Sequence, residues 1–255
     1  RFFYVPKSTS NTPQENVNAK WVVCNPKDML HFSAIGYFFG EKINQSIHAP
    51  VGLINSNWGG TPAETWTPNE VVDENPIIKK GANELGQFDW WPSNTAYAYN
   101  AMIAPLTNFN IAGVLWYQGE SNTDTYYAYE PLFTGMINAW RKAWENDFAF
   151  YFVQIAPFAY GRFNVGALLR EAQTKSSSTA NTGMVVISDL VPDTTNIHPT
   201  LKLEVANRLS NMALQKHYGK KEIKTYRLKN NVQTIQSSRI LRLLVDARKD
   251  ALVTY

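Results

Sequence analysis

The chain has 255 residues, of which 44% are hydrophobic and 18% charged, enough apolar material for one large buried core and a small appendage. Its net charge of +3 is too small to indicate nucleic-acid binding, and no run approaches the roughly 18 apolar residues that a membrane span requires. We therefore expect neither a nucleic-acid partner nor a membrane span. The single cysteine, Cys24, excludes an internal disulfide and a cysteine-rich metal site.

Apolar spacing in the first half predicts a strand at the start of the chain and a polar loop over residues 7–18. Over residues 32–47 apolar side chains recur every four positions, which predicts an amphipathic helix. A short apolar strand over residues 51–54 follows. Residues 64–94 show no strong periodicity, so we expect a long loop that covers part of a cleft.

The second half predicts a regular alternation of strands and helices. Pro131 suits the first turn of a helix, because its missing N–H is not needed there. Strands that alternate with helices are typical of an α/β fold with a parallel sheet and helices on both faces. The predicted elements are a strand at 111–115, a helix at 131–144, a strand at 150–155, a helix at 165–176, a strand at 184–187 and a helix at 200–217.

Beyond residue 221 the pattern changes to short alternating segments at 223–228, 232–235 and 240–245. They indicate the beginning of a β-rich appendage, which we place at 221–255, after a main domain at 1–220. The chain opens in what reads as the middle of a strand and ends on an apolar run. We therefore expect it to be a piece of a longer product.

Three polar turns follow predicted strands, at residues 58–61, 118–122 and 189–198. In a parallel sheet ligands bind outside the carboxyl ends of the strands, so we expect the turns to share one rim. The middle turn is the densest, with an amide, a glycine, a carboxylate, a hydroxyl and a second amide in succession. In the first turn, Gly59 and Gly60 allow backbone N–H groups to face a ligand without a Cβ in the way.

His198 is the one histidine of four that lies beyond a predicted strand end, and Pro199 follows it. A general base on a short rigid loop suits acyl transfer. The alternative is a loop histidine that makes only local hydrogen bonds. No second histidine lies at a metal-ligand spacing from His198, so we expect no metal.

Six short blocks occur in order at residues 32–40, 57–62, 99–106, 116–122, 169–173 and 197–199. Together they resemble sialate O-acetylesterases and related acetylxylan esterases of the SGNH-hydrolase superfamily, over about residues 20–220. The resemblance implies a three-layer α/β/α, flavodoxin-like fold and a secreted or periplasmic serine esterase without a cofactor. Its implied substrate is an acetylated carbohydrate, either sialic acid or acetylated plant polysaccharide.

The resemblance also assigns roles to residues of the three turns. It makes His198 the general base, and Gly60 or its neighbour Gly59 the backbone donor to the oxyanion, with Trp58 beside them. Where the superfamily carries an asparagine in its third block, this chain offers Gln118 and Asn122, and the sequence does not rank them.

The acidic partner of the histidine departs from the family pattern. Many relatives carry an aspartate two or three residues before the histidine, where this chain has Asn196 and Thr195. Neither side chain stabilises an imidazolium by charge. The candidates that remain are Glu120, which we place first, Asp193 and Asp189. The alternative is a serine–histidine dyad without an acidic partner.

The family's nucleophile lies in a Gly-Gln-Ser-Asn turn after the first strand of the sheet, and residues 1–255 contain no such motif. Ser121 follows Gly119, but Thr123 stands where a nucleophile elbow needs a second glycine, so Ser121 is expected to be a hydrogen-bonding residue of the turn. Ser56 has a weaker claim still. We expect an upstream segment of the same gene product to supply the strand and the serine, and the sheet to have a central gap without it.

Two alternatives stay open. A non-catalytic carbohydrate-binding relative with the same fold is favoured by the missing serine and by Asn196. Four tryptophans near the first turn are expected either to stack on sugar rings or to pack in the core. They are Trp58, Trp66, Trp90 and Trp91.

Overall fold

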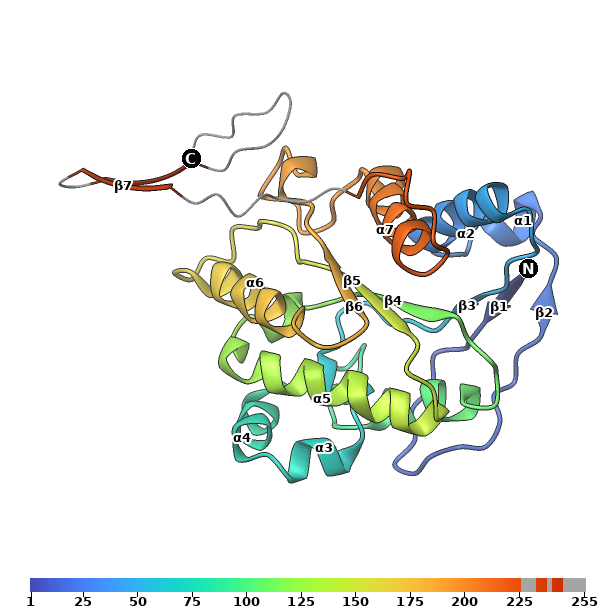
Figure 1. Ribbon diagram of the computed structural model, residues 1–255. Coiled ribbons are helices and arrows are strands. Elements are labelled where there is room, and N and C mark those ends of the chain that lie inside the picture. The colour runs from blue at the N-terminus through green and yellow to red at the C-terminus, as the bar shows by residue number, and fades with distance from the viewer. Residues whose placement is uncertain (226–232, 238–239, 245–255) are drawn as a thin grey trace.

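The computed structural model describes residues 1–225, 233–237 and 240–244 (Figure 1). The strands of the main body form two groups of three. In the first group β1 lies between β2, which is antiparallel to it, and β3, which is parallel to it; in the second, β4, β5 and β6 are all parallel, in that order. Their bounds are Phe2–Tyr4 (β1), Trp21–Val22 (β2), Leu53–Asn55 (β3), Gly113–Tyr117 (β4), Ala149–Val153 (β5) and Thr182–Val185 (β6).

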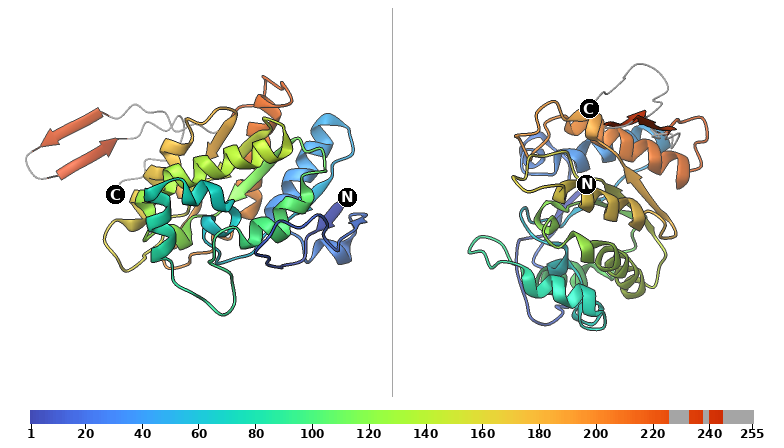
Figure 2. Two further views of the ribbon diagram at one scale, coloured as in Figure 1. Left: turned by 90° about the horizontal axis from the view of Figure 1, so that it is seen from below. Right: turned by 90° about the vertical axis from the view of Figure 1, so that its left-hand side faces the viewer.

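Helices cover both faces of the strands, which confirms the expected three-layer α/β/α architecture (Figure 1). Helices α2 and α7 pack against each other on one face, and α5 and α6 on the other. In both figures α3 and α4 lie on the outer side of α5 (Figure 2). The helices are α1 (Pro26–Met29), α2 (Ala34–Ile47), α3 (Asn69–Asp73), α4 (Pro76–Glu84), α5 (Tyr126–Trp144), α6 (Val165–Ser176) and α7 (Lys202–Lys216).

Helix α2 shows how local sequence sets an element's limits. The Ser33 side chain accepts a hydrogen bond from the Gly36 N–H and caps the helix at its start. At the other end His48 adopts a left-handed conformation, with φ of 53°, and stops the helix. The predicted apolar stripe buries Ile43 fully against the second group of strands. The helix expected at 32–47 is confirmed.

The long loop expected over residues 64–94 is wrong in its first two thirds, where a 3₁₀ turn at Ala63–Trp66 leads into α3 and α4. These helices have 5 and 9 residues, too few turns for an apolar stripe to stand out as a period. The Asn75 side chain starts α4 by accepting from the N–H groups of Ile77 and Ile78, and Pro76 occupies the first helical position.

Helix α5 begins at Tyr126, so Pro131 lies inside the helix and not in its first turn. A proline there removes one backbone hydrogen bond. The turn that precedes it is nevertheless held in place, because Ala128 and Tyr129 are fully buried against the core. Tertiary packing of these residues outweighs the local signal that placed the helix start at Pro131.

The sheet is interrupted between β3 and β4, which lie in the same layer but do not pair (Figure 1). One buried core nonetheless spans the interruption, since Phe3 and Val5 belong to the same apolar cluster as Trp116, Phe150 and Phe152. The interruption is occupied by a cavity of about 900 Å³.

The expected C-terminal segments fall partly outside the described residues. Strands β7 (Gln233–Ser237) and β8 (Ile240–Leu244) form an antiparallel hairpin. Residues 226–228 of the segment at 223–228, residue 232 of the next segment and the whole of 245–255 lie outside the described ranges. The division into domains at residue 220 stays a prediction.

Candidate functional site

The turns that follow β3 and β4 are joined directly by hydrogen bonds. The Ser121 hydroxyl donates to the Gly60 carbonyl at 2.7 Å, and the Gln118 amide donates to the Thr61 carbonyl at 3.2 Å. Because each turn follows its strand, the carboxyl ends of β3 and β4 lie at the same edge of the molecule. The first two polar turns therefore share one rim.

Asn122 is the centre of this junction and is fully buried. Its Oδ1 accepts from the Ala63 N–H at 2.9 Å and from Gln118 Nε2 at 2.8 Å. Its Nδ2 donates to Glu64 Oε2 at 2.8 Å and to Thr125 Oγ1 at 3.3 Å. Both amide hydrogens are thus used within the protein, so Asn122 holds the two turns together.

Gln118 is satisfied in a similar way. Its Nε2 donates to Thr61 and Asn122, its Oε1 accepts from the Tyr129 hydroxyl at 3.0 Å, and its backbone carbonyl accepts from Gln173 Nε2 at 3.1 Å. In this structure both candidate amides therefore fix the shape of the rim.

Glu64 is a member of this network that no pattern in the sequence singles out. Its side chain has 0% exposure, one carboxyl oxygen accepts from Asn122, and the other has no partner among the described residues. Burial raises the pKa of Glu64, and the hydrogen bond from Asn122 opposes that rise. In the sequence Glu64 stands two residues after Pro62, the last residue of the second block. A glutamate at such a position is ordinarily expected on the surface, because charged side chains are rarely fully buried.

The two glycines of the first turn differ sharply in their surroundings. Gly60 has a φ of 87°, and a Cβ there would lie 2.5 Å from the Trp91 ring. At Gly59 a Cβ would meet nothing within 4 Å. Gly60 is therefore required by the backbone and by the close approach of Trp91, whereas the surroundings of Gly59 are open.

Three of the four candidate tryptophans gather beside these glycines. Trp58 Nε1 donates to the Trp90 carbonyl at 3.3 Å, and the rings of Trp90 and Trp91 meet edge to face with centroids 5.8 Å apart. Trp90 is 66% exposed. Trp66 instead belongs to the core, where its Nε1 donates to Thr61 Oγ1 at 2.8 Å. The core interpretation is thus right for Trp66.

His198 lies in the exposed segment between β6 and α7, four residues before Lys202 begins α7. Its backbone N–H donates to Asn196 Oδ1 at 2.9 Å, which closes a tight local turn. The Ala159 N–H donates to the Thr194 carbonyl at 2.9 Å and ties this segment to the loop after β5. Within the part of the chain that the structure describes, the imidazole has no hydrogen bond to Glu120, Asp189 or Asp193.

Two of the three candidate carboxylates are engaged elsewhere. Asp189 makes a two-pronged ion pair with Arg208 of α7, at 2.7 and 2.5 Å, and these hydrogen bonds lower its pKa. Asp193 accepts from both the N–H and the hydroxyl of Thr195, at 2.8 and 2.6 Å, which lowers its pKa as well. Both carboxylates therefore hold the segment in shape.

Glu120 has a different environment. Burial raises its pKa, and its own backbone N–H and the Lys202 ammonium oppose that rise. Burial in turn lowers the pKa of Lys202, while Glu120 opposes this. The Lys202 ammonium lies 5.5 Å from the centre of the Tyr117 ring, at the end of β4. Lys202 had no signal in the sequence beyond its place four residues after His198.

Lys202 brings the start of α7, which follows the third turn, close to the end of β4. It stands just past the His198 loop, yet its charge interacts with Glu120 of the second turn. Burial and the charge of Glu120 also raise the pKa values of Tyr117 and Tyr160, whose buried hydroxyls have no partner among the described residues. The rim thus gathers ionisable and polar groups from three separate segments.

The hydroxyls of the two serines that were considered as nucleophiles both donate to backbone carbonyls. Ser121 bonds to Gly60, as described above, and the Ser56 hydroxyl donates to the Met102 carbonyl at 2.9 Å. Neither hydroxyl has a histidine as its hydrogen-bond partner. Ser121 is thus a hydrogen-bonding residue of the turn in this structure.

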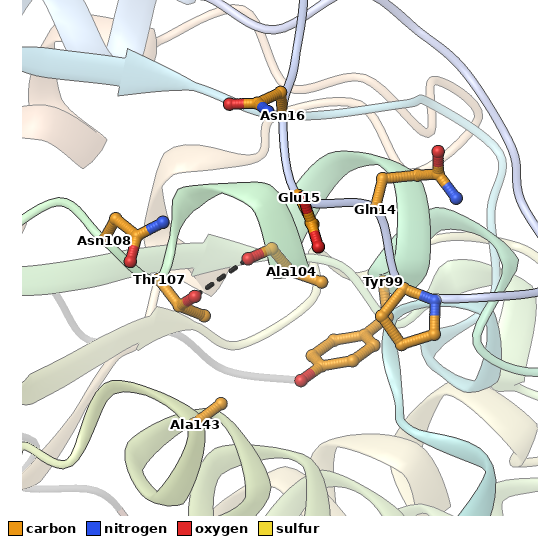
Figure 3. A pocket seen from close by; sticks show the side chains of 9 residues that line it. Gln14, Glu15, Asn16, Tyr99, Ala104, Thr107, Asn108 and Ala143 are labelled. Atoms are coloured by element: carbon orange, nitrogen blue, oxygen red, sulfur yellow. Dashed lines mark hydrogen bonds between the residues drawn. The ribbon is translucent and has the colours of Figure 1, made fainter.

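A second cavity, of about 510 Å³, shares none of these rim residues (Figure 3). Its wall includes the half-buried Tyr99 and the Thr107 hydroxyl, which donates to the Ala104 carbonyl at 2.9 Å.

Among the described residues no group of three histidine, cysteine, aspartate or glutamate side chains is placed to hold a metal ion. None of the helices in the same part of the chain has the length and apolar character that a membrane span requires.

Comparison with known proteins places this arrangement in a family. Residues 15–215 match the family described as carbohydrate esterase, sialic acid-specific acetylesterase. Human sialate O-acetylesterase is 32% identical over 216 residues, covering 76% of this chain and 40% of the human protein. The mouse protein is 29% identical over 266 residues, covering 86% of this chain and 49% of its own length. The chain therefore spans less than half the length of these curated relatives.

A solved structure agrees with the sequence comparisons. A carbohydrate acetylesterase from Xanthomonas citri superposes with a TM-score of 0.77 at 32% identity, over 96% of this chain and 55% of that protein. Since the family match covers most of the chain and includes all three turns of the rim, the chain belongs to the carbohydrate esterase family of sialic acid-specific acetylesterases.

Proposed function

We propose that the protein to which this chain belongs is a carbohydrate O-acetylesterase that works through a serine and His198. The observation that carries the proposal is the junction of the first two polar turns, where the Ser121 hydroxyl donates to the Gly60 carbonyl. The start of α7, just after the His198 loop, lies near this junction, since the Lys202 ammonium is 5.5 Å from the centre of the Tyr117 ring. Acyl transfer needs a base, an oxyanion site and an acidic group within reach of one another. The family resemblance supports the same chemistry.

The proposed reaction begins with a serine from an upstream segment of the same gene product. Its Oγ attacks the acetyl carbonyl carbon while His198 takes its proton. The bond between the carbonyl carbon and the sugar oxygen then breaks, and His198 returns the proton to the leaving hydroxyl. Water, activated by His198, attacks the acetyl-enzyme, releases acetate and restores the serine.

The oxyanion is proposed to accept from a backbone N–H at Gly59 or Gly60. Gln118 and Asn122 support this role indirectly, because their amides hold the turn that carries the glycines. Of the three carboxylates, Glu120 is proposed to stabilise the imidazolium of His198. Asp189 and Asp193 are less suited, since each is already held by a neighbour.

The substrate is proposed to be an acetylated sugar of sialic acid or of plant polysaccharide. Trp90 supports this, because its ring is 66% exposed beside the half-buried Trp58 and Trp91, and an exposed aromatic face next to the oxyanion turn suits stacking on a sugar ring. A secreted or periplasmic location is part of the proposal. Rates of acetate release from 9-O-acetylated sialic acid and from acetylated xylo-oligosaccharide would decide between the two substrates.

The test is hydrolysis of p-nitrophenyl acetate by the full-length gene product and by its His198→Ala variant. The His198→Ala variant lacks the general base, so its kcat/KM is expected to fall by at least about 100-fold. His31→Ala is the matched control, since His31 is exposed on the loop before α2. Equal rates for the wild type and His198→Ala would overturn the mechanism. Binding of acetylated glycan without hydrolysis would instead favour the non-catalytic carbohydrate-binding alternative.

A further inference from the structure

Glu64 holds its carboxyl group inside the protein, just after the first turn of the rim. It is the second residue of the 3₁₀ turn Ala63–Trp66, and its exposure is 0%. One carboxyl oxygen accepts from Asn122 at 2.8 Å, and the other has no hydrogen-bond partner among the described residues. Glutamates are rarely buried so completely, so this position calls for a specific reason.

The orientation of the Asn122 amide decides whether the first two turns are joined. Its Oδ1 accepts from the Ala63 N–H at 2.9 Å and from Gln118 Nε2 at 2.8 Å. Both partners are donors, and a side-chain amide accepts only at its oxygen. Turning the amide by about 180° would set its NH₂ group against both donors and break both hydrogen bonds.

Glu64 supplies the shorter of the two contacts that fix this orientation. Asn122 Nδ2 donates to Glu64 Oε2 at 2.8 Å and to Thr125 Oγ1 at 3.3 Å. The first distance lies within the usual range of an N–H···O hydrogen bond, whereas the second is beyond it. The carboxyl group of Glu64 is therefore the main acceptor that keeps the amide turned with its oxygen toward the first turn.

The same network holds the segment that carries the proposed oxyanion donors. Gln118 Nε2, which bonds to Asn122, also donates at 3.2 Å to the carbonyl of Thr61, the residue after Gly60. Ala63, two residues further along, is bonded to Asn122 directly. Both attachments therefore depend on Asn122, and a change in its orientation would release the segment that includes the two glycines.

The network uses the acceptor oxygen of Glu64 and not its charge. Burial raises the pKa of Glu64, which favours the neutral carboxyl group, although the hydrogen bond from Asn122 opposes the rise. A neutral carboxyl group keeps a carbonyl oxygen that accepts from an amide. The role therefore needs a side chain of this length with an acceptor at its end, which glutamine also provides.

We propose that Glu64 is a positioning residue of the esterase, which orients the Asn122 amide and through it holds Gly59 and Gly60 where the oxyanion is received. Glu64 acts through Asn122 and does not itself touch the reacting atoms. The catalytic part of this inference rests on the proposed function, whereas the orientation of Asn122 by Glu64 stands without it.

Two substitutions separate the acceptor of Glu64 from its charge. Glu64→Gln keeps the length of the side chain and the acceptor but removes the acid. Glu64→Asp keeps the acid but withdraws the carboxyl group by one methylene, which leaves Asn122 Nδ2 without its nearer acceptor. A role that depends on the acceptor tolerates the first substitution and not the second.

Hydrolysis of p-nitrophenyl acetate by the full-length gene product gives kcat and KM for each variant. Glu64→Gln is expected to keep kcat within about threefold of the wild type, because the acceptor is retained. Glu64→Asp is expected to lower kcat at least about tenfold and to leave KM within about twofold, since a displaced oxyanion turn acts on the transition state and not on substrate binding.

Ile137→Ala is the control for loss of stability alone. Ile137 lies in α5 with 0% exposure, and its replacement leaves a cavity in the core. Its side chain is apolar and has no part in the hydrogen bonds around Asn122. The variant is expected to unfold at a lower temperature than the wild type and to keep the wild-type kcat when assayed well below that temperature.

The orientation of Asn122 is measured without any reaction by nuclear magnetic resonance of the full-length product labelled with nitrogen-15 at its asparagines. Exchange of the Asn122 side-chain amide protons is expected to be slow in the wild type and in Glu64→Gln. In Glu64→Asp it is expected to be at least about tenfold faster, because the amide has lost its nearer acceptor.

A wild-type kcat in Glu64→Asp, or an equal loss of kcat in Glu64→Gln and Glu64→Asp, would overturn the positioning role. The same fall in kcat in Ile137→Ala would assign the effect to stability and overturn it as well. A wild-type protein without esterase activity would refute the proposed function and the catalytic part with it. Equal amide exchange in the wild type and in both Glu64 variants would refute the orientation of Asn122 by Glu64.

Discussion

At the residue scale, the two neighbouring glycines of the first turn differ in whether they can accept a side chain: Gly59 has room for one and Gly60 does not. Gly60 combines a positive φ with a Trp91 ring in van der Waals contact, whereas Gly59 faces open space. The sequence shows only a glycine pair and does not distinguish them, because the difference comes from a residue 31 positions away. The pair therefore offers a matched test of why this turn needs glycine.

Gly60→Ala is expected to lower the free energy of unfolding by about 2–4 kcal/mol, from the left-handed backbone and the overlap with Trp91 together. Gly59→Ala is expected to change it by less than about 0.5 kcal/mol. Urea unfolding monitored by tryptophan fluorescence measures both. Similar losses in the two variants would contradict the assignment of the close contact to Gly60.

Glu64 gives a pH-dependent prediction at the same scale. Burial raises its pKa in the folded protein above the unfolded value near 4.5. The stability linked to its protonation is therefore fully present below pH 4.5 and is lost as pH rises through the folded pKa. Glu64→Gln, which keeps the neutral shape and an acceptor for Asn122, removes this dependence.

Wild type is accordingly expected to lose stability relative to Glu64→Gln as pH rises from 4.5, until the carboxyl is ionised in the folded state. The measurement is the free energy of unfolding of both proteins between pH 4 and 9. A difference between them that stays constant over this range would show that the carboxyl of Glu64 is not perturbed.

At the element scale, the Asp189 carboxylate connects the segment after β6 to α7. Arg208 donates to both its oxygens and to the Val186 carbonyl at 2.6 Å, so one side chain clamps the start of the His198 segment. The pair is only partly shielded, with side-chain exposures of 28% for Asp189 and 12% for Arg208. Its contribution is therefore modest.

Asp189→Asn is expected to destabilise the protein by about 1 kcal/mol at pH 7. Because the folded pKa of Asp189 is lowered, its contribution is present above the unfolded value near 3.8 and disappears as pH falls through the folded pKa. Thermal unfolding at pH 7 and at pH 3 tests this. Asp73→Asn, whose partner Lys79 lies on an exposed surface, is the control and is expected to have little effect.

Helix starts show where element prediction succeeds and where it fails. Helix α2 was placed correctly because its apolar period and its cap at Ser33 agree. Helix α5 was started five residues late, because the burial of Tyr129 that fixes its first turn depends on the core and not on neighbouring sequence. Short helices such as α3 were not predicted, because one or two turns are too short for the apolar residues to show a helical period.

At the scale of the whole molecule, the two groups of strands share one core. Residues of β1 lie in the same apolar cluster as residues of β4 and β5, and α2 packs against α7 across the interruption. Unfolding one group would expose the apolar surface of the other. The main body is therefore expected to unfold as a single unit in spite of the break.

This predicts coincident urea transitions for far-ultraviolet circular dichroism and for tryptophan fluorescence. Two separated transitions would show that the groups of strands are independent folding units.

The sequence by itself determined the alternation of strands and helices after residue 111 and the family, because apolar period and turn residues act over a few positions. It also determined which turns carry polar groups and singled out His198. Only the tertiary structure decided that Gln118 and Asn122 are held inside the protein, that Trp66 is in the core, that Glu64 is buried and that Lys202 lies near Tyr117. These facts depend on contacts between residues tens of positions apart, which no local pattern encodes. The same holds for the interruption of the sheet, where β3 and β4 lie in one layer with a cavity between them and do not pair.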